Sequence, residues 1–370
     1  MKMIKVLAVL GTRPEAIKMC PVIKELEKYN EVQVIVCTTG QHREMLVPIL
    51  KVFQVTPQYD LNIMKEKQTL FDITGNAVAG MREVLEREKP ETVLVHGDTT
   101  SAFAAALACF YMKIPVCHVE AGLRTYNHYS PYPEEFNRQA VDSIAEIFFA
   151  PTETAKMNLV REGRAESKIF VTGNTVIDAL KTTVCTNYSH EILQWAGNDK
   201  LILLTAHRRE NVGKVMEKMF LAVKEVAAQF EDVKVVYPVH MNPEVQGIAE
   251  KVLGDVNRIK LVAPLEVVDF HNIMSRSYFI MTDSGGIQEE APALGKPVLV
   301  MRNTTERPEG VKAGTLKLVG TEQEEIRNAM MNLLTDKEAY RKMATATNPY
   351  GDGRAAERIA KIILSEWEMR

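Results

Sequence analysis

Several features that identify common classes of protein are missing from this chain of 370 residues. A net charge of only −3 gives no broad electrostatic field that would favour nucleic acid or an anionic membrane as a partner. Apolar runs such as VLVH and LILLTA have the length of strands, so no segment is expected to cross a bilayer. The glycine motifs G-x-G-x-x-G and G-x-x-x-x-G-K-[ST] do not occur, which removes the usual support for a redox dinucleotide site or a P-loop.

Cysteine is also scarce, with five residues that are odd in number and lack C-x-x-C spacing. We therefore expect buried thiols in a reducing cytoplasm and no zinc site. Histidines, cysteines and carboxylates show no convincing metal spacing, so we predict neither a metal nor another cofactor. The amino-terminal MKMIKVLAVLG leads directly into GTRPEAIK without a small-residue cleavage site, and we interpret it as a strand and not as a signal peptide. The cysteines are Cys20, Cys37, Cys109, Cys117 and Cys185.

Strand-like and helix-like segments alternate along the chain, which predicts parallel sheets with helices on both faces. A chain of this length is expected to form two domains. The alternation weakens over residues 174–199, which we interpret as a connector, and restarts at Leu201. The boundary is therefore predicted at residues 173 and 174. The expected strands are Ile4–Leu10, Val32–Thr38, Thr92–Val95, Pro115–Val119, Ile147–Ala150, Ile169–Val171, Leu201–Thr205, Val233–Pro238, Ile259–Val262, Tyr278–Thr282, Pro297–Met301 and Thr315–Leu318.

The stretch Asp283–Gly310 carries the strongest indication of a ligand. Gly285 and Gly286 would let a ligand approach the backbone, because no Cβ stands in the way, and the N–H groups of the following helix would form an anion site. Glu290 is placed to accept hydrogen bonds from sugar hydroxyls. Arg307 could fork onto phosphate, so this loop predicts a site for diphosphate and ribose. The alternative is an ordinary strand-to-helix turn, where the helix dipole favours glutamate.

Charged side chains follow the predicted strands of the first domain. Arg13 and Lys18 flank the first turn, where cations oppose the helix dipole, so an anionic ligand is favoured, more for Arg13 than for Lys18. Asp98 could be a helix cap instead of a catalytic group, and the dipole offers a similar alternative for Glu134. Glu120 is the better catalytic candidate, because no helix follows it. The three carboxylates could share general acid–base work if the fold brings them together.

The segment AHRREN, where the second domain begins, is rich in hydrogen-bond donors. His207 with its two arginine neighbours indicates a site for phosphate or a leaving group, although a lone histidine is more often a satisfied polar residue. His240 is placed similarly, with weaker support. His42 is expected at the surface unless a ligand reaches its helix. Because ligands of open α/β sheets bind beyond the carboxyl ends of the strands, two sheets facing each other would gather these segments around one cleft.

These segments, in this order, resemble the non-hydrolysing UDP-N-acetylglucosamine 2-epimerases over nearly the whole chain. The resemblance implies a GT-B architecture, an α/β fold of two Rossmann-like, doubly wound parallel-sheet domains around a central cleft. The final helix would cross back, so that residues 354–370 join the domain 1–173 and residues 174–353 form the UDP-binding domain. The matching blocks are GTRPEAIK, GQHREM, LVHGDTT, HVEAGLRT, SPYPEE-x-NRQ, VTGN, TAHRREN, YPVHMNP, DSGGIQEEAP-x-LGKPVLV, TTERPEG and NPYGDG.

The resemblance also implies a reaction, the interconversion of UDP-GlcNAc and UDP-ManNAc. Family members eliminate UDP across C1–C2 to give 2-acetamidoglucal and then add UDP back with C2 inverted. The product would feed surface polysaccharide synthesis, and a homodimer is expected. The positions that match the family's catalytic set are Asp98, Glu120, Glu134 and His207. Those that match or surround its UDP-binding set are Arg13, Lys18, Phe270, Ser284, Gly285, Gly286, Glu290 and Arg307.

Bacterial members of the family also tend to bind UDP-GlcNAc as an activator beside the substrate. Glu44 and Lys67 stand where some members have glutamine and arginine. A lysine cannot reproduce a bidentate arginine contact to phosphate, and an added carboxylate repels diphosphate, so activation is predicted to be weaker here. The matching positions are Gln41, His42, Lys67, Gln68, Glu134, Arg208 and His240.

Three rival functions are weighed against the epimerase. A GT-B glycosyltransferase with a UDP-sugar donor would share DSGGIQEE, but the charged residues of the first domain favour the epimerase. A hydrolysing epimerase, which releases free ManNAc, often carries a fused kinase domain for which this chain has no length. A silent nucleotide-sugar sensor would not need the acid–base set.

Overall fold

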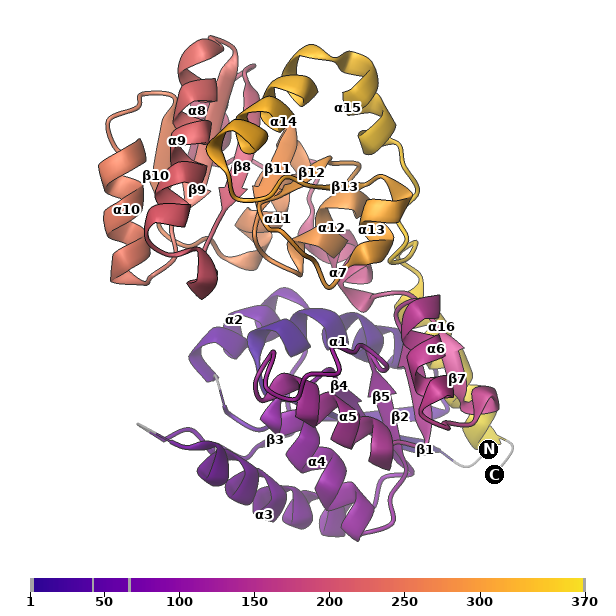
Figure 1. Cartoon of the computed structure of the whole chain (residues 1–370). Coiled ribbons are helices and arrows are strands. Elements are labelled where there is room, and N and C mark those ends of the chain that lie inside the picture. Colours follow the sequence, from indigo (N-terminus) through magenta and orange to yellow (C-terminus); the bar gives the residue numbers. More distant parts are fainter. Residues whose placement is uncertain (1–2, 42, 66–67, 369–370) are drawn as a thin grey trace. The chain divides into compact units, whose positions relative to one another are not determined.

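The chain forms two compact α/β units, shown in Figure 1. This computed structural model describes residues 3–41, 43–65 and 68–368. Unit 1 contains the residues up to Thr182 together with those from Tyr350 onward, and unit 2 is Thr183–Pro349. The unit boundaries therefore lie at Thr183 and Tyr350, whereas the sequence placed them at residues 174 and 354. Within the described ranges, no helix has both the length and the apolar character that a bilayer span requires.

Unit 1 is built on a parallel sheet with the strand order β3-β2-β1-β4-β5-β6-β7 among its described residues. Helices α1, α2 and α16 cover one face of this sheet, and α3, α4 and α5 cover the other (Figure 1). The strands are β1 (Ile4–Leu10), β2 (Val32–Thr38), β3 (Tyr59–Asp60), β4 (Thr92–His96), β5 (Val116–Val119), β6 (Ile147–Ala150) and β7 (Ile169–Val171). The α-helices are α1 (Arg13–Leu26), α2 (Arg43–Val52), α3 (Leu70–Glu88), α4 (Thr100–Tyr111), α5 (Glu134–Ile144), α6 (Glu153–Arg161), α7 (Thr175–Thr183) and α16 (Ala355–Glu368).

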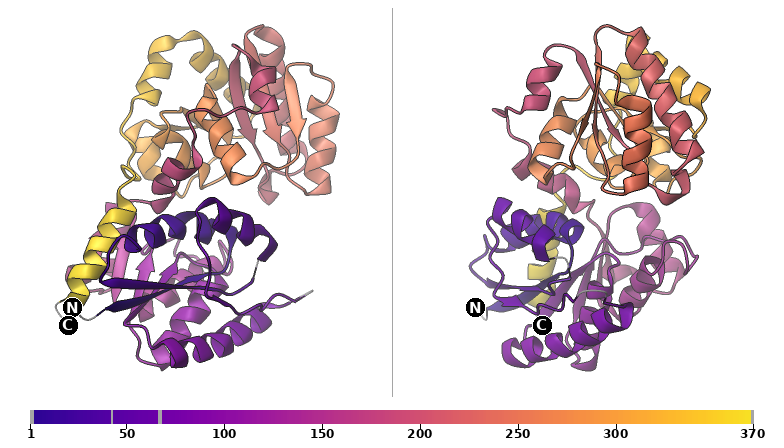
Figure 2. Two further views of the ribbon diagram at one scale, coloured as in Figure 1. Left: turned by 180° about the vertical axis from the view of Figure 1, so that it is seen from behind. Right: turned by 90° about the vertical axis from the view of Figure 1, so that its left-hand side faces the viewer.

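Helix α16 belongs to unit 1 although it follows unit 2 in the sequence. It packs on α1, as both views in Figure 2 show, where α16 is yellow. Trp367 is buried and donates from Nε1 to the carbonyl oxygen of Glu91 at 3.2 Å, and Lys168 forms an ion pair with Glu366. At the other end of α16, the carboxylate of Asp178 accepts from the N–H groups of Ala355 and Ala356, both at 3.1 Å. These contacts fix both ends of the helix on unit 1.

Unit 2 is built on a second parallel sheet with the strand order β10-β9-β8-β11-β12-β13 among its described residues. The strands are β8 (Lys200–Thr205), β9 (Val233–Pro238), β10 (Ile259–Val262), β11 (Phe279–Thr282), β12 (Val298–Val300) and β13 (Leu316–Leu318). The α-helices are α8 (Glu191–Ala196), α9 (Lys214–Gln229), α10 (Pro243–Leu253), α11 (Val267–Arg276), α12 (Ile287–Ala293), α13 (Pro308–Ala313), α14 (Gln323–Thr335) and α15 (Lys337–Ala344).

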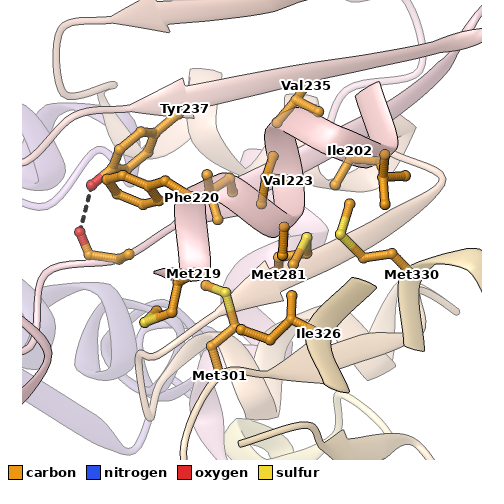
Figure 3. Packing of buried hydrophobic residues seen from close by; sticks show 14 of the residues in the cluster. Ile202, Met219, Phe220, Val223, Val235, Tyr237, Met281, Met301, Ile326 and Met330 are labelled. Carbon is orange, nitrogen blue, oxygen red and sulfur yellow. Dashed lines mark hydrogen bonds between the residues drawn. The ribbon is translucent and has the colours of Figure 1, made fainter. Parts of the chain in front are cut away.

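The core of unit 2 lies where α9 and α14 pack against the sheet. Figure 3 shows side chains from β8, β9 and β11 meeting those of these two helices. Phe220 and Tyr237 are fully buried and pack edge to face, with ring centroids 5.3 Å apart. The Tyr237 hydroxyl donates to the carbonyl oxygen of Ala206 at 2.6 Å, which is the dashed line in Figure 3. A buried phenol thus anchors the first residue after β8, in the segment that carries His207.

The structure corrects three sequence expectations. The region 174–199 is not an irregular connector, because it contains α7 and α8. The polar segment TTERPEG contains the start of α13, and the short strand β3 has no counterpart among the expected strands. Among the cysteines, Cys185 is exposed, whereas the other four are buried. Burial raises the pKa of Cys20, Cys37 and Cys109 to about 12 and makes these thiols poor nucleophiles.

Candidate functional site

The strand orders define one switch point in each sheet. In unit 1, β1 pairs with β2 on one side and β4 on the other, so the chain winds outward in both directions from the β1–β4 pair. In unit 2, the β8–β11 pair has the same position. Open α/β sheets bind ligands beyond the carboxyl ends of the strands at such points, because the connections there diverge to opposite faces. The segments that directly follow β1, β4, β8 and β11 are GTRPE, GDTT, AHRREN and DSGG.

Glu120 is the most constrained side chain of the unit 1 site. It directly follows β5 with a φ of 66°, a left-handed conformation that is uncommon for a residue with a side chain and is often found at functional sites. Its carboxylate forms an ion pair with Lys18 and accepts a hydrogen bond from Asn174 Nδ2 at 3.0 Å. The side chain is only 11 % exposed. The structure thus brings together Lys18 and Glu120, two candidates of the sequence analysis that lie 102 positions apart.

Arg13 is the first residue of α1, and Glu15, in the first turn of this helix, is buried. The Glu15 carboxylate accepts from Thr99 Oγ1 at 2.8 Å and from the Gly11 N–H at 3.1 Å. It thereby joins the loops after β1 and β4 at the switch point. Burial raises the pKa of Glu15 to about 7, because desolvation outweighs these hydrogen bonds.

Asp98 is held by its neighbours on α5. Its carboxylate pairs with Arg138 at 2.5 Å, and its carbonyl oxygen accepts from Asn137 Nδ2 at 3.0 Å. The alternative reading of Asp98 as the helix cap is wrong, because Thr99 caps α4 by accepting from the N–H of Ala102 at 3.0 Å. The Asp98 side chain therefore points to an arginine and not into the helix start.

Glu134 is the first residue of α5, and the next residue, Glu135, is fully buried. Glu135 accepts from the backbone N–H groups of Thr125 and Tyr126 at 3.0 and 2.9 Å. It thus fixes the loop that leads from β5 to α5. Glu134 itself is half-buried at the end of this braced segment.

A buried histidine–aspartate pair supports the loops that carry Asp98 and Glu120. His118 lies 2.6 Å from Asp142 through Nδ1 and 2.7 Å from the carbonyl oxygen of Gly97 through Nε2. The other oxygen of Asp142 accepts from the N–H of Gly122 at 3.2 Å. Both side chains are fully buried, so this pair braces the backbone on either side of the two candidate carboxylates.

In unit 2, the carboxylate of Asp283 organises the segment after β8. It accepts from the backbone N–H groups of His207 and Arg208 and from Asn211 Nδ2, at 3.0 to 3.1 Å. His207 Nδ1 lies 3.4 Å from the same carboxylate, and its ring stacks on that of His240 with centroids 5.5 Å apart. Burial lowers the pKa of His207, so its neutral form is favoured at neutral pH.

The two glycines of DSGG open onto empty space within unit 2. A Cβ at Gly285 would meet no protein atom within 4 Å, and the nearest to one at Gly286 would be Glu290 Oε1 at 3.7 Å. Neither glycine has a positive φ, so a left-handed backbone conformation does not explain why glycine occupies these two positions. The absence of side chains here therefore leaves room for a ligand near the backbone. The helix that directly follows these glycines, α12, is short, with only seven residues.

Glu290, Arg307 and Ser284, three further predicted UDP-binding residues, contact neighbouring residues of unit 2. Glu290 lies 3.4 Å from Nε2 of the buried His271, whose Nδ1 lies 2.7 Å from Thr183 Oγ1. Arg307, just before α13, forms an ion pair with the buried Glu289. Phe270 is half-buried on α11, and Ser284 directly follows Asp283, with its N–H donating to Thr282 Oγ1 at 2.9 Å.

The predicted activator residues are divided between the units. In unit 1, Gln41 accepts from Ser101 Oγ at 2.7 Å, and Gln68 lies shortly before α3. In unit 2, Arg208 donates from Nε to the carbonyl oxygen of Asp283 at 2.9 Å, and His240 is exposed beside His207. His42 and Lys67 lie outside the described residues.

Sequence reasoning missed several residues of these sites, namely His96, Arg138, Asn174, Asp283 and His271. Arg138 and Asn174 stand within the segments NRQ and VTGN, yet neither segment shows which carboxylate its side chain meets. Asp283 is part of DSGG, but the interpretation of that motif rested on its two glycines. Within the described parts of the chain, no cluster of three or more histidine, cysteine or carboxylate residues could hold a metal ion.

Comparison with known proteins identifies relatives of the whole chain. The family model described as UDP-N-acetylglucosamine 2-epimerase matches residues 24–364. The UDP-N-acetylglucosamine 2-epimerase of Bacillus subtilis is 58 % identical over 370 residues, covering 100 % of this chain and 97 % of the relative. Among solved structures, the MnaA–UDP co-structure from S. aureus has a TM-score of 0.91 at 48 % identity, covering 100 % of this chain and 98 % of that one. The UDP-GlcNAc 2-epimerase of Neisseria meningitidis bound to UDP-GlcNAc has a TM-score of 0.88 at 49 % identity, covering 98 % and 100 %.

Proposed function

Because the chain belongs to the UDP-N-acetylglucosamine 2-epimerase family, we propose that it interconverts UDP-GlcNAc and UDP-ManNAc by eliminating UDP and adding it back. One observation carries this proposal, namely that the switch points of the two sheets have complementary chemistry. Unit 1 presents carboxylates held by cations and amides, whereas unit 2 presents an open glycine turn beside histidine and arginine. An elimination of UDP needs both kinds of group.

The reaction is demanding because the C2 hydrogen of the sugar is not adjacent to a carbonyl. In the forward elimination, a base removes the proton from C2, and the C–H electron pair becomes the C1–C2 double bond. The C1–O bond breaks, and its electrons leave on the β-phosphate oxygen of UDP. UDP then adds back to C1 while a proton is delivered to the opposite face of C2, which inverts that carbon.

Unit 2 is proposed to retain UDP while the glycosidic bond is broken. The backbone at Ser284, Gly285 and Gly286 would receive the diphosphate, and Arg307 would add positive charge. Glu290 would accept hydrogen bonds from the ribose, and Phe270 would contact the nucleotide. His207, favoured in its neutral form and oriented by Asp283, would donate a hydrogen bond to the departing phosphate oxygen.

Unit 1 is proposed to supply the groups that act at C2. Asp98, Glu120 and Glu134 are the carboxylates that could remove or deliver the proton, and they belong to three segments, after β4, after β5 and at the start of α5. Arg13 and Lys18 add positive charge at the same switch point, where the substrate is anionic. Holding these groups in fixed orientations avoids reorganisation during the reaction, which is the main source of electrostatic catalysis.

A second UDP-GlcNAc molecule is proposed as an activator, bound near Gln41, His42, Gln68, Arg208 and His240. Lys67 gives this site one ammonium in place of a forked guanidinium, so we expect weak activation. We further propose a cytoplasmic homodimer whose product supplies surface polysaccharide synthesis. The molar mass from light scattering tests the dimer, since one chain has a mass of 41.6 kDa.

The decisive experiment is an NMR time course of the purified protein with UDP-GlcNAc in D2O. We expect UDP-ManNAc to appear with deuterium at C2 and without free sugar. Free ManNAc together with UDP would reassign the protein to the hydrolysing class. Bound but unchanged UDP-GlcNAc would contradict the proposal and would indicate a glycosyltransferase that lacks its acceptor, or a sensor.

A further inference from the structure

His96 is a buried histidine that the proposed reaction leaves without a role. It is the last residue of β4, at the switch point of unit 1, and is only 3 % exposed. Its Nε2 is buried and makes no hydrogen bond with the described parts of the chain. A buried polar atom without a partner is costly, so its retention at this position requires an explanation.

The unpartnered nitrogen lies close to Glu120. Nε2 of His96 is 3.8 Å from Oε2 of Glu120, which is longer than a hydrogen bond but within the reach of a small side-chain rotation. The same oxygen already receives Lys18 and Asn174. Glu120 in its ionised form is therefore satisfied by donors from α1 and from the residue before α7.

His96 is neutral in its surroundings. Desolvation lowers its pKa to about 3 against the opposing effect of Glu120, and the positive charge of Lys18 lowers it further. A neutral imidazole carries one N–H donor and one lone pair, and it can exchange them between its two nitrogens. Nε2 can therefore donate to an ionised carboxylate or accept from a protonated one.

A carboxylate that takes up a proton during turnover needs a partner for each protonation state. Lys18 and Asn174 can only donate through the nitrogens that face Glu120, so they suit the anion and offer nothing to a carboxylic O–H. Nε2 of His96 can accept that O–H. Asp98 differs, because its carboxylate pairs with the permanently charged Arg138, which cannot accept a hydrogen bond.

We propose that His96 is a positioning residue that accepts a hydrogen bond from Glu120 when Glu120 is protonated, and that Glu120 is therefore the carboxylate that carries the proton taken from C2. Only the claim that Glu120 carries the proton taken from C2 rests on the proposed epimerase reaction. The proton leaves C2, binds to one oxygen of Glu120 and is held between that oxygen and the lone pair of His96 Nε2. No other reactant is needed.

The first test reads the imidazole directly and does not depend on activity. The protein contains eight histidines, and in ¹⁵N-histidine-labelled protein the signals of His96 are assigned by their loss in His96→Gln. We expect His96 to remain neutral between pH 5 and 9, a range chosen to lie above its pKa. In the wild type its proton should lie on Nε2, which faces the ionised Glu120, and the tautomer should change when that carboxylate is removed in Glu120→Ala. A tautomer that behaves identically in the two proteins, or an imidazolium in this range, would overturn the proposal.

The second test separates positioning from a structural role by kinetics. His96→Gln keeps one donor and one acceptor, whereas His96→Leu has neither. We expect His96→Leu to lower kcat by about 10- to 100-fold with KM changed by less than about threefold, as for loss of a hydrogen bond to a group that carries charge in turnover. His96→Gln should recover most of kcat.

Thr92→Val is the matched control, because Thr92 is a buried polar residue at the opposite end of the same strand. It should lower the melting temperature without lowering kcat. Equal kcat losses in the two His96 variants, or an equal loss in Thr92→Val, would contradict the positioning role. If the wild type fails to epimerise UDP-GlcNAc, the proposed function fails, while the NMR test still decides whether His96 and Glu120 are coupled.

Discussion

The buried carboxylate of Asp283 accepts hydrogen bonds from the backbone N–H of His207 at 3.1 and 3.0 Å, across 76 positions of the sequence. This contact joins the carboxyl ends of β8 and β11, which are neighbours in the sheet. It holds the segment of the proposed leaving-group histidine beside the glycine turn of the proposed diphosphate site. One side chain thus couples two motifs that are far apart in the chain.

Asp283→Asn is expected to damage both stability and catalysis. Asparagine keeps one acceptor oxygen but replaces the other with an NH2 donor, so some of the buried N–H groups around it would lose their acceptor, at a cost of roughly 1–3 kcal/mol in the free energy of unfolding. His207 would lose its orientation, so kcat should fall as well. Thermal unfolding and initial rates measure the two effects. Asp255→Asn, which removes an exposed partner of Lys224, should change neither, and an unaffected Asp283→Asn enzyme would refute this role.

Glu120→Gln is expected to abolish most of the activity while leaving UDP binding intact. Glutamine keeps the shape of the side chain but cannot take up a proton, and general base catalysis contributes about 10²- to 10⁴-fold to a rate. Calorimetry should give a Kd for UDP within a few fold of the wild-type value, because most of the proposed UDP contacts lie on unit 2. Glu166→Gln, at an exposed pair with Lys156, serves as the control. Full activity in Glu120→Gln would remove Glu120 from the catalytic set.

Glu15 is expected to make the stability of the protein fall as the pH rises. Its pKa is raised from 4.5 to about 7 by burial, so between these values the folded state holds a proton that the unfolded state has released. The ionised form is therefore penalised in the folded state, and the penalty is complete above about pH 7. Its limiting size is roughly 3 kcal/mol, from about 1.4 kcal/mol per pKa unit.

Glu15→Gln, which resembles the protonated form, tests this linkage. The stability of the wild type relative to this variant should be greatest near pH 4.5 and should decrease toward pH 7. Urea unfolding at several pH values measures the difference, with Glu338→Gln as an exposed control. Parallel stability curves for wild type and Glu15→Gln would exclude the predicted role of desolvation.

Lys67→Arg is expected to strengthen activation by a second UDP-GlcNAc. A guanidinium can bind phosphate through two parallel hydrogen bonds, whereas an ammonium acts as a point charge. Rates measured against substrate concentration should become more sigmoidal in the variant, with little change at saturation. A strongly sigmoidal wild-type curve that Lys67→Arg leaves unchanged would contradict the prediction of weak activation.

The sequence predicts most of the fold because the buried strands are strongly patterned. The expected bounds of β1 and β2, Ile4–Leu10 and Val32–Thr38, agree with the structure residue for residue. Strand β3 escaped notice because two residues show no periodicity, and only its pairing with β2 makes it a strand. Helix α7 lies in a polar region, yet it buries Val176 and Leu180 on one face.

The site was less predictable, because neighbours in a sheet are not neighbours in the sequence. The motifs named the candidates Lys18 and Glu120, but their ion pair depends on a strand order that periodicity does not reveal. The sequence places His96 just after the expected strand Thr92–Val95, and nothing in LVHGDTT distinguishes a core histidine from one that faces a carboxylate. Such contacts follow from tertiary packing alone.

The return of α16 to unit 1 has a consequence for the order in which the protein is made. Unit 1 lacks its last helix until the ribosome has synthesised all of unit 2, because Thr183–Pro349 interrupts it. Until then the apolar face that Trp367 and its neighbours cover stays open to water. Unit 2, which is continuous, can complete its core first during translation. The amino-terminal half of the chain is thus the last part of the nascent protein to finish folding.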